Sequence, residues 1–390
     1  MRRVCGWLIV LLCFAPLVRA QDETRQLAPG QPADDVLSAS SPIHVYAVTP
    51  ETASEQTVHL QNSGVIALSM ALIDPAGVQL DAIASIAGGA AADMRWLGSG
   101  GTTYHVLISP AEALDDHQAQ FTLTLVAPES VGALQFFLTW QAPVRLRLEI
   151  RDPLGEALSP DNPQTEDGGA FSGDTDAVDC AAYSEHTAAQ TAGWQPESLP
   201  TGSYEIRVRY VDGCVDSVDF RLEARLHDQT FAPITATMHT GGTFVAGLIV
   251  RDDGSGAIAE RSGVVSDGRA LTIPTANLLT SAQPLPVGGA ASDRIGGDAP
   301  FRSYYFQGQL GDSISATVER QSGNLDVMLA LLDINGNLFA VSDDDGKTGA
   351  ALSGVRLRRS GTYLIVVTRY AQYLGATEGD FQLTVGGAGT

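Results

Sequence analysis

The residues of this sequence most suited to chemistry form one acidic loop near the end of the chain. Asp343, Asp344 and Asp345 stand in a row, and Gly346 follows them. Consecutive carboxylates on a turn can converge on a hard cation such as Ca²⁺, and a glycine permits the sharp bend that this requires. We expect Asp326 to lie close by across a hairpin, so the four aspartates predict a calcium site. The spacing is not that of an EF-hand, and a solvated hairpin tip is the competing interpretation.

Three tyrosines are candidates for holding a ligand. Tyr305 lies among adjacent aromatic residues on an expected strand, and Tyr370 and Tyr373 flank a loop that follows another strand. Exposed tyrosines on the face of a β-sandwich can stack on sugar rings or grip a peptide. Packing in the core or at a sheet edge is the competing interpretation for all three.

Catalytic patterns are missing from the sequence. The seven histidines are scattered, and no His-Glu-x-x-His, Gly-x-Ser-x-Gly or phosphate-binding glycine motif occurs. We therefore predict that the protein is not an enzyme. A hydrolase that uses acidic residues in the middle of the chain is the alternative.

The start of the chain predicts export. Arg2 and Arg3 precede an apolar stretch, and Val18 and Ala20 occupy the −3 and −1 positions of a cleavage site. We expect residues 1–20 to be a signal peptide and the protein to be periplasmic, cell-surface or extracellular. No later stretch offers about 18 apolar residues in a row, so no membrane span is predicted in the mature chain.

The charge of the chain excludes two classes of partner. The formal net charge is −22, and loss of the signal peptide removes three arginines and no acid. So acidic a protein repels nucleic acid and anionic lipid surfaces. The acidity suits solubility outside the cell or cation binding.

Cysteine use agrees with export. Cys5 and Cys13 leave with the signal peptide, so Cys180 and Cys214 form an even pair in an oxidising compartment. We predict a disulfide between them. Two free thiols or a metal pair are the alternatives, and neither has further cysteines or nearby histidines to support it.

A strand that starts with glycine and carries a tyrosine recurs three times, at 101–109, 202–210 and 361–368. Before each copy an apolar strand runs into an Asp-x-x-Gly turn, in which the aspartate opens the turn and the glycine takes the position with positive φ. These turns begin at Asp74, Asp152 and Asp333. A repeated order of elements indicates repeated domains, and short strands with closely spaced turn signals favour β-sandwiches.

We therefore predict an all-β chain of three tandem β-sandwiches, jelly-roll-like or immunoglobulin-like, after the signal peptide. The expected parts are a flexible linker over 21–34, sandwiches over 35–128 and 129–275, a linker over 276–294, and a sandwich over 295–390.

Several runs in the third sandwich carry a family resemblance. They are residues 304–314 and 324–329, the turns at 333–337 and 342–346, and the strands at 360–363 and 379–385. Together they resemble the bacterial pre-peptidase C-terminal (PPC) domain, a jelly-roll-like β-sandwich. The first sandwich looks like a degenerate copy, which keeps the turn at Asp74 but has residues 84–90 in place of an acidic loop.

The second sandwich differs from the other two. Thr139-Trp140, the turn at Asp152, Trp194 and the run from Gly202 to Cys214 make it similar to the YfaP-like sandwich of exported bacterial proteins. Arg145-Leu-Arg-Leu stands where that family has an Asp-rich segment, which weakens the transfer of a cation site to this sandwich.

These resemblances imply a class of function. PPC domains usually accompany secreted hydrolases, and related folds bind collagen or polysaccharide. We predict a non-catalytic binding or structural protein of the cell envelope or extracellular space, which recognises polysaccharide or protein. The alternative is an accessory or targeting subunit of a separately encoded secreted hydrolase, a protease or a glycosidase.

Overall fold

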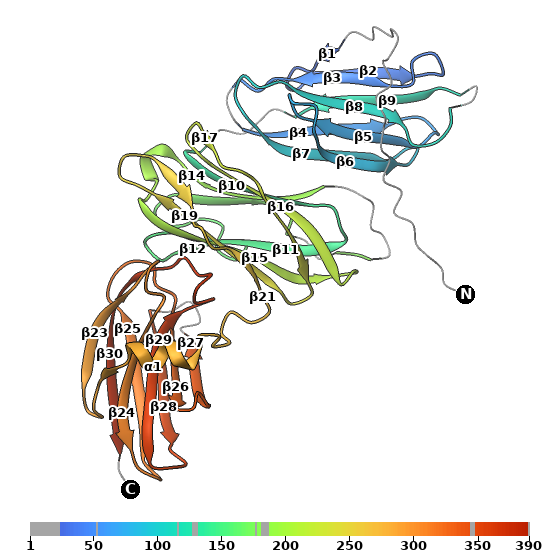
Figure 1. The fold of residues 1–390 in the computed structure, drawn as a ribbon. Helices are drawn as coiled ribbons and strands as arrows, with labels where there is room; N and C mark the ends of the chain where they lie inside the picture. Colours follow the sequence, from blue (N-terminus) through green and yellow to red (C-terminus); the bar gives the residue numbers. More distant parts are fainter. Residues whose placement is uncertain are drawn as a thin grey trace, which may run out of the picture. The chain divides into compact units, whose positions relative to one another are not determined.

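The structure is a computed structural model that describes residues 24–388 except 52–53, 115–116, 127–131, 176–177, 181–186 and 344–347. The predicted signal peptide lies outside the described residues. Almost all regular structure is β, as predicted, and the described strands form six sheets that pack in pairs as sandwiches (Figure 1). The chain divides into two compact units, of which the second contains the second and third sandwiches. Within the described part of the chain, no helix is long and apolar enough to cross a membrane.

The first sandwich pairs the sheet β1-β3-β8-β5-β6 with the sheet β2-β9-β4-β7. Tyr46 and Phe121 meet edge to face between the two sheets, with ring centroids 6.3 Å apart. Its strands are β1 (Arg25–Gln26), β2 (Pro32–Leu37), β3 (His44–Val48), β4 (Ser54–Asn62), β5 (Leu68–Ile73), β6 (Gln79–Ile86), β7 (Ala91–Gly98), β8 (Tyr104–Pro110) and β9 (Ala119–Leu125).

Residues 25–34 differ from the flexible linker predicted over 21–34. β1 pairs in parallel with β3, and β2 pairs antiparallel with β9 along its whole length. Leu27 and Leu37 are buried, so two apolar side chains in and beside this polar segment pack into the core. Hydrogen bonds to the edges of the two sheets fix the rest of it. A segment with so few apolar residues forms strands because neighbouring strands supply the hydrogen bonds.

The second sandwich pairs the sheet β13-β14-β10-β16 with the sheet β12-β11-β15-β19, and short strands extend both. Its core holds Trp194 against Tyr204, with ring centroids 5.2 Å apart. Its strands are β10 (Leu134–Trp140), β11 (Val144–Arg151), β12 (Ala157–Leu158), β13 (Gly169–Gly173), β14 (Ala188–Trp194), β15 (Gly202–Gly213), β16 (Ser217–Leu226), β17 (Gln229–Thr230), β18 (Ile234–His239), β19 (Thr243–Val250), β20 (Gly256–Ile258) and β21 (Gly263–Val265).

The third sandwich pairs the sheet β22-β24-β29-β26-β27 with the sheet β23-β30-β25-β28. Apolar side chains from both sheets fill the space between them. Its elements are α1 (Thr275–Ser281), β22 (Gln283–Pro284), β23 (Ala290–Ile295), β24 (Phe301–Gly308), β25 (Ser313–Arg320), β26 (Val327–Asp333), β27 (Leu338–Asp343), β28 (Gly349–Arg356), β29 (Gly361–Arg369) and β30 (Gly379–Ala388).

The linker predicted over 276–294 is part of the third sandwich instead. It contains most of α1, all of β22, and β23, which pairs with β30. Ile273 and Leu278 are buried against Leu332 and Val366 on the outer face of the β26–β29 pair. This face is apolar, so the Ala- and Pro-rich segment covers it rather than running free in solvent.

The recurring tyrosine strand is central in its sheet each time. β8, β15 and β29 each pair with a strand on either side. The buried Tyr204 and Tyr363 hydroxyls donate to backbone carbonyls four residues earlier, at 2.7 and 2.8 Å. In the second and third sandwiches the tyrosine therefore buries its ring while its hydroxyl bonds to the backbone.

Candidate functional site

The turn between β11 and β12 places a carboxylate in the interior of the second sandwich. Asp152 opens this turn, and its Oδ1 accepts the backbone N–H groups of Leu154, Gly155 and Glu156 at 2.8, 2.7 and 3.0 Å. Gly155 has a φ of 97°, the left-handed conformation predicted for the glycine of this turn. The Asp152 side chain is fully buried, and its second oxygen, Oδ2, has no hydrogen-bond partner.

Two further carboxylates stand beside Asp152. Glu156 closes the same turn, Asp167 lies in the loop before β13, and one oxygen from each of the three lies within 4.8 Å of the others. We call these three residues the carboxylate cluster. Across the described ranges, it is the one group of three acidic, histidine or cysteine side chains close enough to hold a metal ion.

Asp167 is fixed in place by the core of the sandwich. Its Oδ1 accepts the indole N–H of Trp194 at 3.1 Å and the hydroxyl of Thr165. Its Oδ2 is buried and has no hydrogen-bond partner. The cluster therefore holds two buried carboxylate oxygens that receive no donor.

The electrostatics of the cluster reflect this lack of donors. Burial, and after it the nearby Asp167 carboxylate, raises the pKa of Asp152 to about 6, against the effect of the three backbone N–H groups. Burial also raises the pKa of Tyr204, with added contributions from Asp152 and Asp167. Negative charge is therefore costly at this position unless a cation compensates it.

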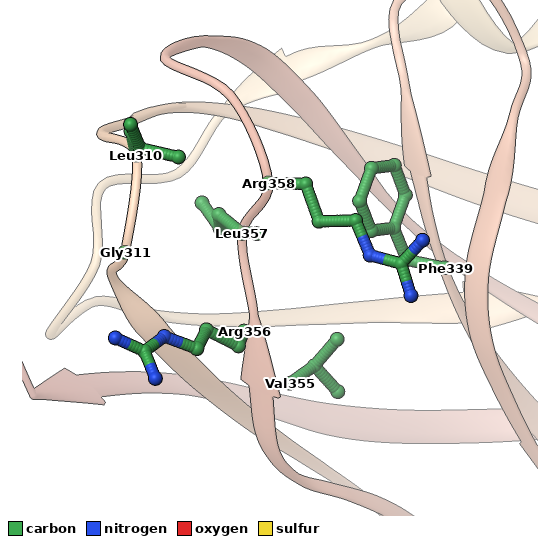
Figure 2. A pocket seen from close by; sticks show the side chains of 7 residues that line it. All are labelled: Leu310, Gly311, Phe339, Val355, Arg356, Leu357 and Arg358. Carbon is green, nitrogen blue, oxygen red and sulfur yellow. The ribbon is translucent and has the colours of Figure 1, made fainter.

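A second candidate site is a depression on the third sandwich, with a volume of about 820 Å³ (Figure 2). We call it the arginine depression. Arg356 and Arg358 flank the buried Leu357, and Leu310 and Phe339 add apolar surface. Both arginines are exposed, and no described residue forms an ion pair or hydrogen bond with either guanidinium.

The predicted calcium loop is described in part. Asp344 and Asp345 lie outside the described residues. The Asp343 carboxylate, which is mostly buried, accepts a hydrogen bond from Nε of Arg269 at 2.6 Å. Calcium at this loop stays a prediction.

Asp326 has a different role from the predicted one. Its buried carboxylate accepts from the Arg207 guanidinium of the second sandwich, and Arg151 lies 3.4 Å away. Burial would lower the pKa of Arg207, but Glu205, Asp326 and Glu149 hold it well above its usual range. Because two guanidinium groups already compensate Asp326, the structure does not support it as a calcium ligand.

Tyr370 also belongs to this buried region. It is 8% exposed, and the Arg207 guanidinium carbon lies 4.0 Å from its ring centroid. The prediction of Tyr370 as an exposed ligand contact is therefore wrong, because the ring packs on Arg207. We call the contact between the second and third sandwiches around Arg207, Asp326 and Tyr370 the buried junction.

The other two tyrosines lie in different settings. Tyr305 is 38% exposed on β24, and its role as a ligand contact stays a prediction. Tyr373 is half-buried, packs edge to face on Phe301 with ring centroids 6.3 Å apart, and has the guanidinium carbon of Arg261 at 5.5 Å. These contacts give Tyr373 a packing role, and the three tyrosines do not form one site.

The predicted disulfide is present. Cys180 and Cys214 are bridged, with Cα atoms 5.6 Å apart. The bridge joins the segment after β13 to the residue that follows β15. It therefore ties the end of the recurring tyrosine strand to an earlier loop of the same sandwich.

Sequence reasoning missed both candidate sites. It identified Asp152 as the start of a turn, and nothing in the spacing indicates that Asp167 returns beside it. The arginine depression had only a weak signal. Arg356 and Arg358 stand on either side of an apolar residue, but the same spacing occurs at Arg145 and Arg147 and at Arg207 and Arg209, so it does not distinguish this site.

Comparisons with known proteins give distant likenesses. No family model matches the chain, and no curated protein matches it. The PPC domain of a Bacillus anthracis collagenase aligns at 15% identity over 27% of this chain and 93% of that one, with a TM-score of 0.23. Tandem CBM51 modules of a family 98 glycoside hydrolase from Streptococcus pneumoniae align at 7% identity over 90% of this chain and 81% of that one, with a TM-score of 0.18. Values this low say nothing about the ligand, and the PPC-like and YfaP-like resemblances stay predictions.

Proposed function

We propose that this protein is an exported, non-catalytic binding protein that recognises an acidic polysaccharide through the arginine depression. The observation that carries the proposal is the pair of exposed guanidinium groups, Arg356 and Arg358, without described partners. They form a local positive patch on a protein whose net charge of −22 repels polyanions elsewhere. Guanidinium groups bind carboxylates, sulfates and phosphates in a two-point geometry, so an anionic ligand suits them.

The apolar part of the depression suits a sugar chain. Leu310 is 66% exposed, and the half-buried Phe339 lines the same depression. Aromatic and aliphatic side chains pack against the C–H faces of sugar rings, while arginines fix charged substituents. An open surface depression also admits a long polymer, which an enclosed pocket would not.

The disulfide supports the exported setting. A bridge between Cys180 and Cys214 persists in an oxidising compartment and is rare in the cytosol. Acidic polysaccharides of the envelope or the extracellular space share that setting. An accessory role beside a separately encoded hydrolase stays an alternative, and no described contact favours it.

Binding tests the proposal directly. The mature chain should retard on gels that contain alginate, pectate or a sulfated glycan, and should not retard on gels with neutral glucans. The double variant Arg356→Gln/Arg358→Gln should lose at least tenfold in affinity, because both two-point contacts are removed. Incubation of the protein with these glycans should release no new reducing ends, because a non-catalytic protein does not hydrolyse them.

A matched control removes the same charge elsewhere. Arg251→Gln/Arg294→Gln changes two exposed arginines outside the depression and should keep the affinity within about twofold. Equal loss in both double variants would indicate a general charge effect and would contradict the proposal. Binding to a protein partner but to no glycan would also contradict it.

A further inference from the structure

We propose that the carboxylate cluster of Asp152, Glu156 and Asp167 binds a calcium ion. The cluster joins the turn between β11 and β12 to the loop before β13, so side chains about 15 residues apart in sequence meet at one point. The site belongs to the second sandwich and is separate from the acidic loop at Asp343. It does not depend on the polysaccharide ligand.

The buried oxygens without donors are the main evidence. Asp152 is 0% exposed, and its Oδ1 accepts hydrogen bonds from three backbone N–H groups. Its Oδ2 accepts no hydrogen bond. Oδ2 of Asp167 is also buried and accepts no hydrogen bond. A buried carboxylate oxygen without a partner is strongly destabilising, and proteins normally supply a hydrogen bond or a cation.

In the part of the chain that the structure describes, no basic side chain forms an ion pair with the cluster. Among the described residues, none of the three carboxylates takes part in an ion pair. The Arg320 guanidinium lies near Gly155, but among the described residues it forms no ion pair with Asp152. A bound cation would therefore compensate the negative charge of the three carboxylates, which the described side chains of the protein do not compensate.

The spacing of the oxygens indicates the kind of cation. Calcium binds oxygen at 2.3–2.6 Å, so two ligands on opposite sides of the ion lie about 4.6–5.2 Å apart. The separations in the cluster, all within 4.8 Å, meet this limit. Magnesium binds at 2.0–2.1 Å and demands a near-ideal octahedron, whereas Ca²⁺ accepts the irregular set of carboxylates that a turn and a loop provide. Three hard oxygen ligands do not suit zinc or copper, which prefer nitrogen and sulfur.

One member of the cluster borders a surface depression. Asp167 lines a surface depression with a volume of about 590 Å³, and Glu166 and Glu197 line it as well. Two acidic side chains at this depression attract cations, and the open side leaves room for water ligands. Glu156 can reorient toward the ion, although one of its oxygens accepts the Glu166 N–H at 2.7 Å.

Calcium binding is tested on the mature, disulfide-bonded chain after treatment with a chelator. Added Ca²⁺ should raise the melting temperature, and titration calorimetry should find a calcium site that Asp167→Asn removes, with at least a tenfold loss of affinity. Mg²⁺ should bind at least tenfold more weakly than Ca²⁺. Asp161→Asn, which changes a 76% exposed acid of the same sandwich, should behave as the native chain does.

Two further measurements keep the test decisive. In chelator, Asp167→Asn should melt at or above the native temperature, because the amide removes repulsion with Asp152. Tb³⁺ should show luminescence sensitised by Trp194, whose indole contacts Asp167, and Ca²⁺ should displace it. Absence of any calcium response, or a response kept by Asp167→Asn and lost by Asp344→Asn/Asp345→Asn, would overturn the proposal.

Discussion

The guanidinium of Arg207, on β15 of the second sandwich, donates to the carboxylate of Asp326, which directly precedes β26 of the third. Both side chains are 4% exposed. Arg207 also donates to Glu205, and Glu149 lies 3.5 Å away. One buried guanidinium is thus shared by carboxylates of two sandwiches. Because these hydrogen bonds are directional, they fix how the two sandwiches contact each other at the buried junction.

Removing the charge of Asp326 should destabilise the second compact unit. Asp326→Asn leaves Arg207 and Arg151 with less compensation, and breaking a buried pair costs about 3–5 kcal/mol. Urea unfolding followed by circular dichroism should show this loss. Asp298→Asn, a change at an exposed acid of the third sandwich, should stay within about 0.5 kcal/mol of the native chain.

A paired replacement tests whether the ion pair stands alone. Arg207→Met/Asp326→Leu removes one guanidinium and one carboxylate together, and such swaps are often neutral when the pair is isolated. Here we expect the double variant to be less stable than Asp326→Asn, because the buried Glu205 loses its Arg207 donor and Arg151 loses Asp326. If Asp326→Asn unfolds with the native midpoint, the ion pair contributes nothing to the junction.

Asn324 should be the second determinant of the junction. Its Nδ2 donates to the carbonyls of Asp152 and Ser203 at 2.9 and 2.6 Å, and its Oδ1 accepts the Glu378 N–H at 2.9 Å. Asn324→Ala leaves these buried groups without partners, at about 1–3 kcal/mol for each unsatisfied group. Limited proteolysis should cut Asn324→Ala between the second and third sandwiches faster than the native chain. Equal rates would exclude this role.

Local patterns predicted much of the fold. The aspartate of each turn and the following glycine define hairpins from residues a few positions apart, and Gly77, Gly155 and Gly336 all have positive φ as expected. The tyrosine strands were recognisable for the same reason. The even cysteine pair was sufficient to predict the bridge.

Long-range contacts explain what the sequence did not predict. Arg207 and Asp326 are 119 positions apart, so an acid beside an apparent calcium loop is compensated by an arginine of another sandwich. The polar residues near Asp35 resemble a linker, but they hydrogen-bond to β9. The composition of a segment predicts how polar it is. It does not predict whether a neighbouring strand is available to form hydrogen bonds with the segment.

The disulfide should stabilise the second sandwich by restricting its unfolded chain. Cys180 and Cys214 are 34 positions apart, and closing a loop of that length is worth about 3–4 kcal/mol in the chain-entropy model. Cys180→Ser/Cys214→Ser should lower the urea midpoint accordingly, and reduction of the native chain should lower it equally. A reducing agent should leave the double variant unchanged, and any further loss there would point to another cause.

The first sandwich should lose stability in acid through Asp35. The Asp35 carboxylate accepts the Tyr46 hydroxyl at 2.5 Å and interacts with Nδ1 of His44 at 2.7 Å. Burial opposes ionisation, but the hydrogen bonds from Tyr46, the Val36 N–H and His44 outweigh it, so the pKa of Asp35 lies below its usual value of 3.8. A lowered folded pKa stabilises the fold above pH 3.8, and that contribution disappears as the pH falls through the folded value.

Asp35→Asn should therefore cost about 1–2 kcal/mol at neutral pH and progressively less as the pH falls through the folded pKa of Asp35, because the native carboxyl then becomes protonated as well. Hydrogen exchange of β2 and β3, measured by mass spectrometry between pH 2 and 7 and corrected for intrinsic rates, gives the opening free energy. Asp34→Asn is the control, since that exposed neighbour has a single hydrogen bond to Thr122. A difference between native and Asp35→Asn that stays constant over this pH range would mean that the Asp35 charge does not stabilise β2.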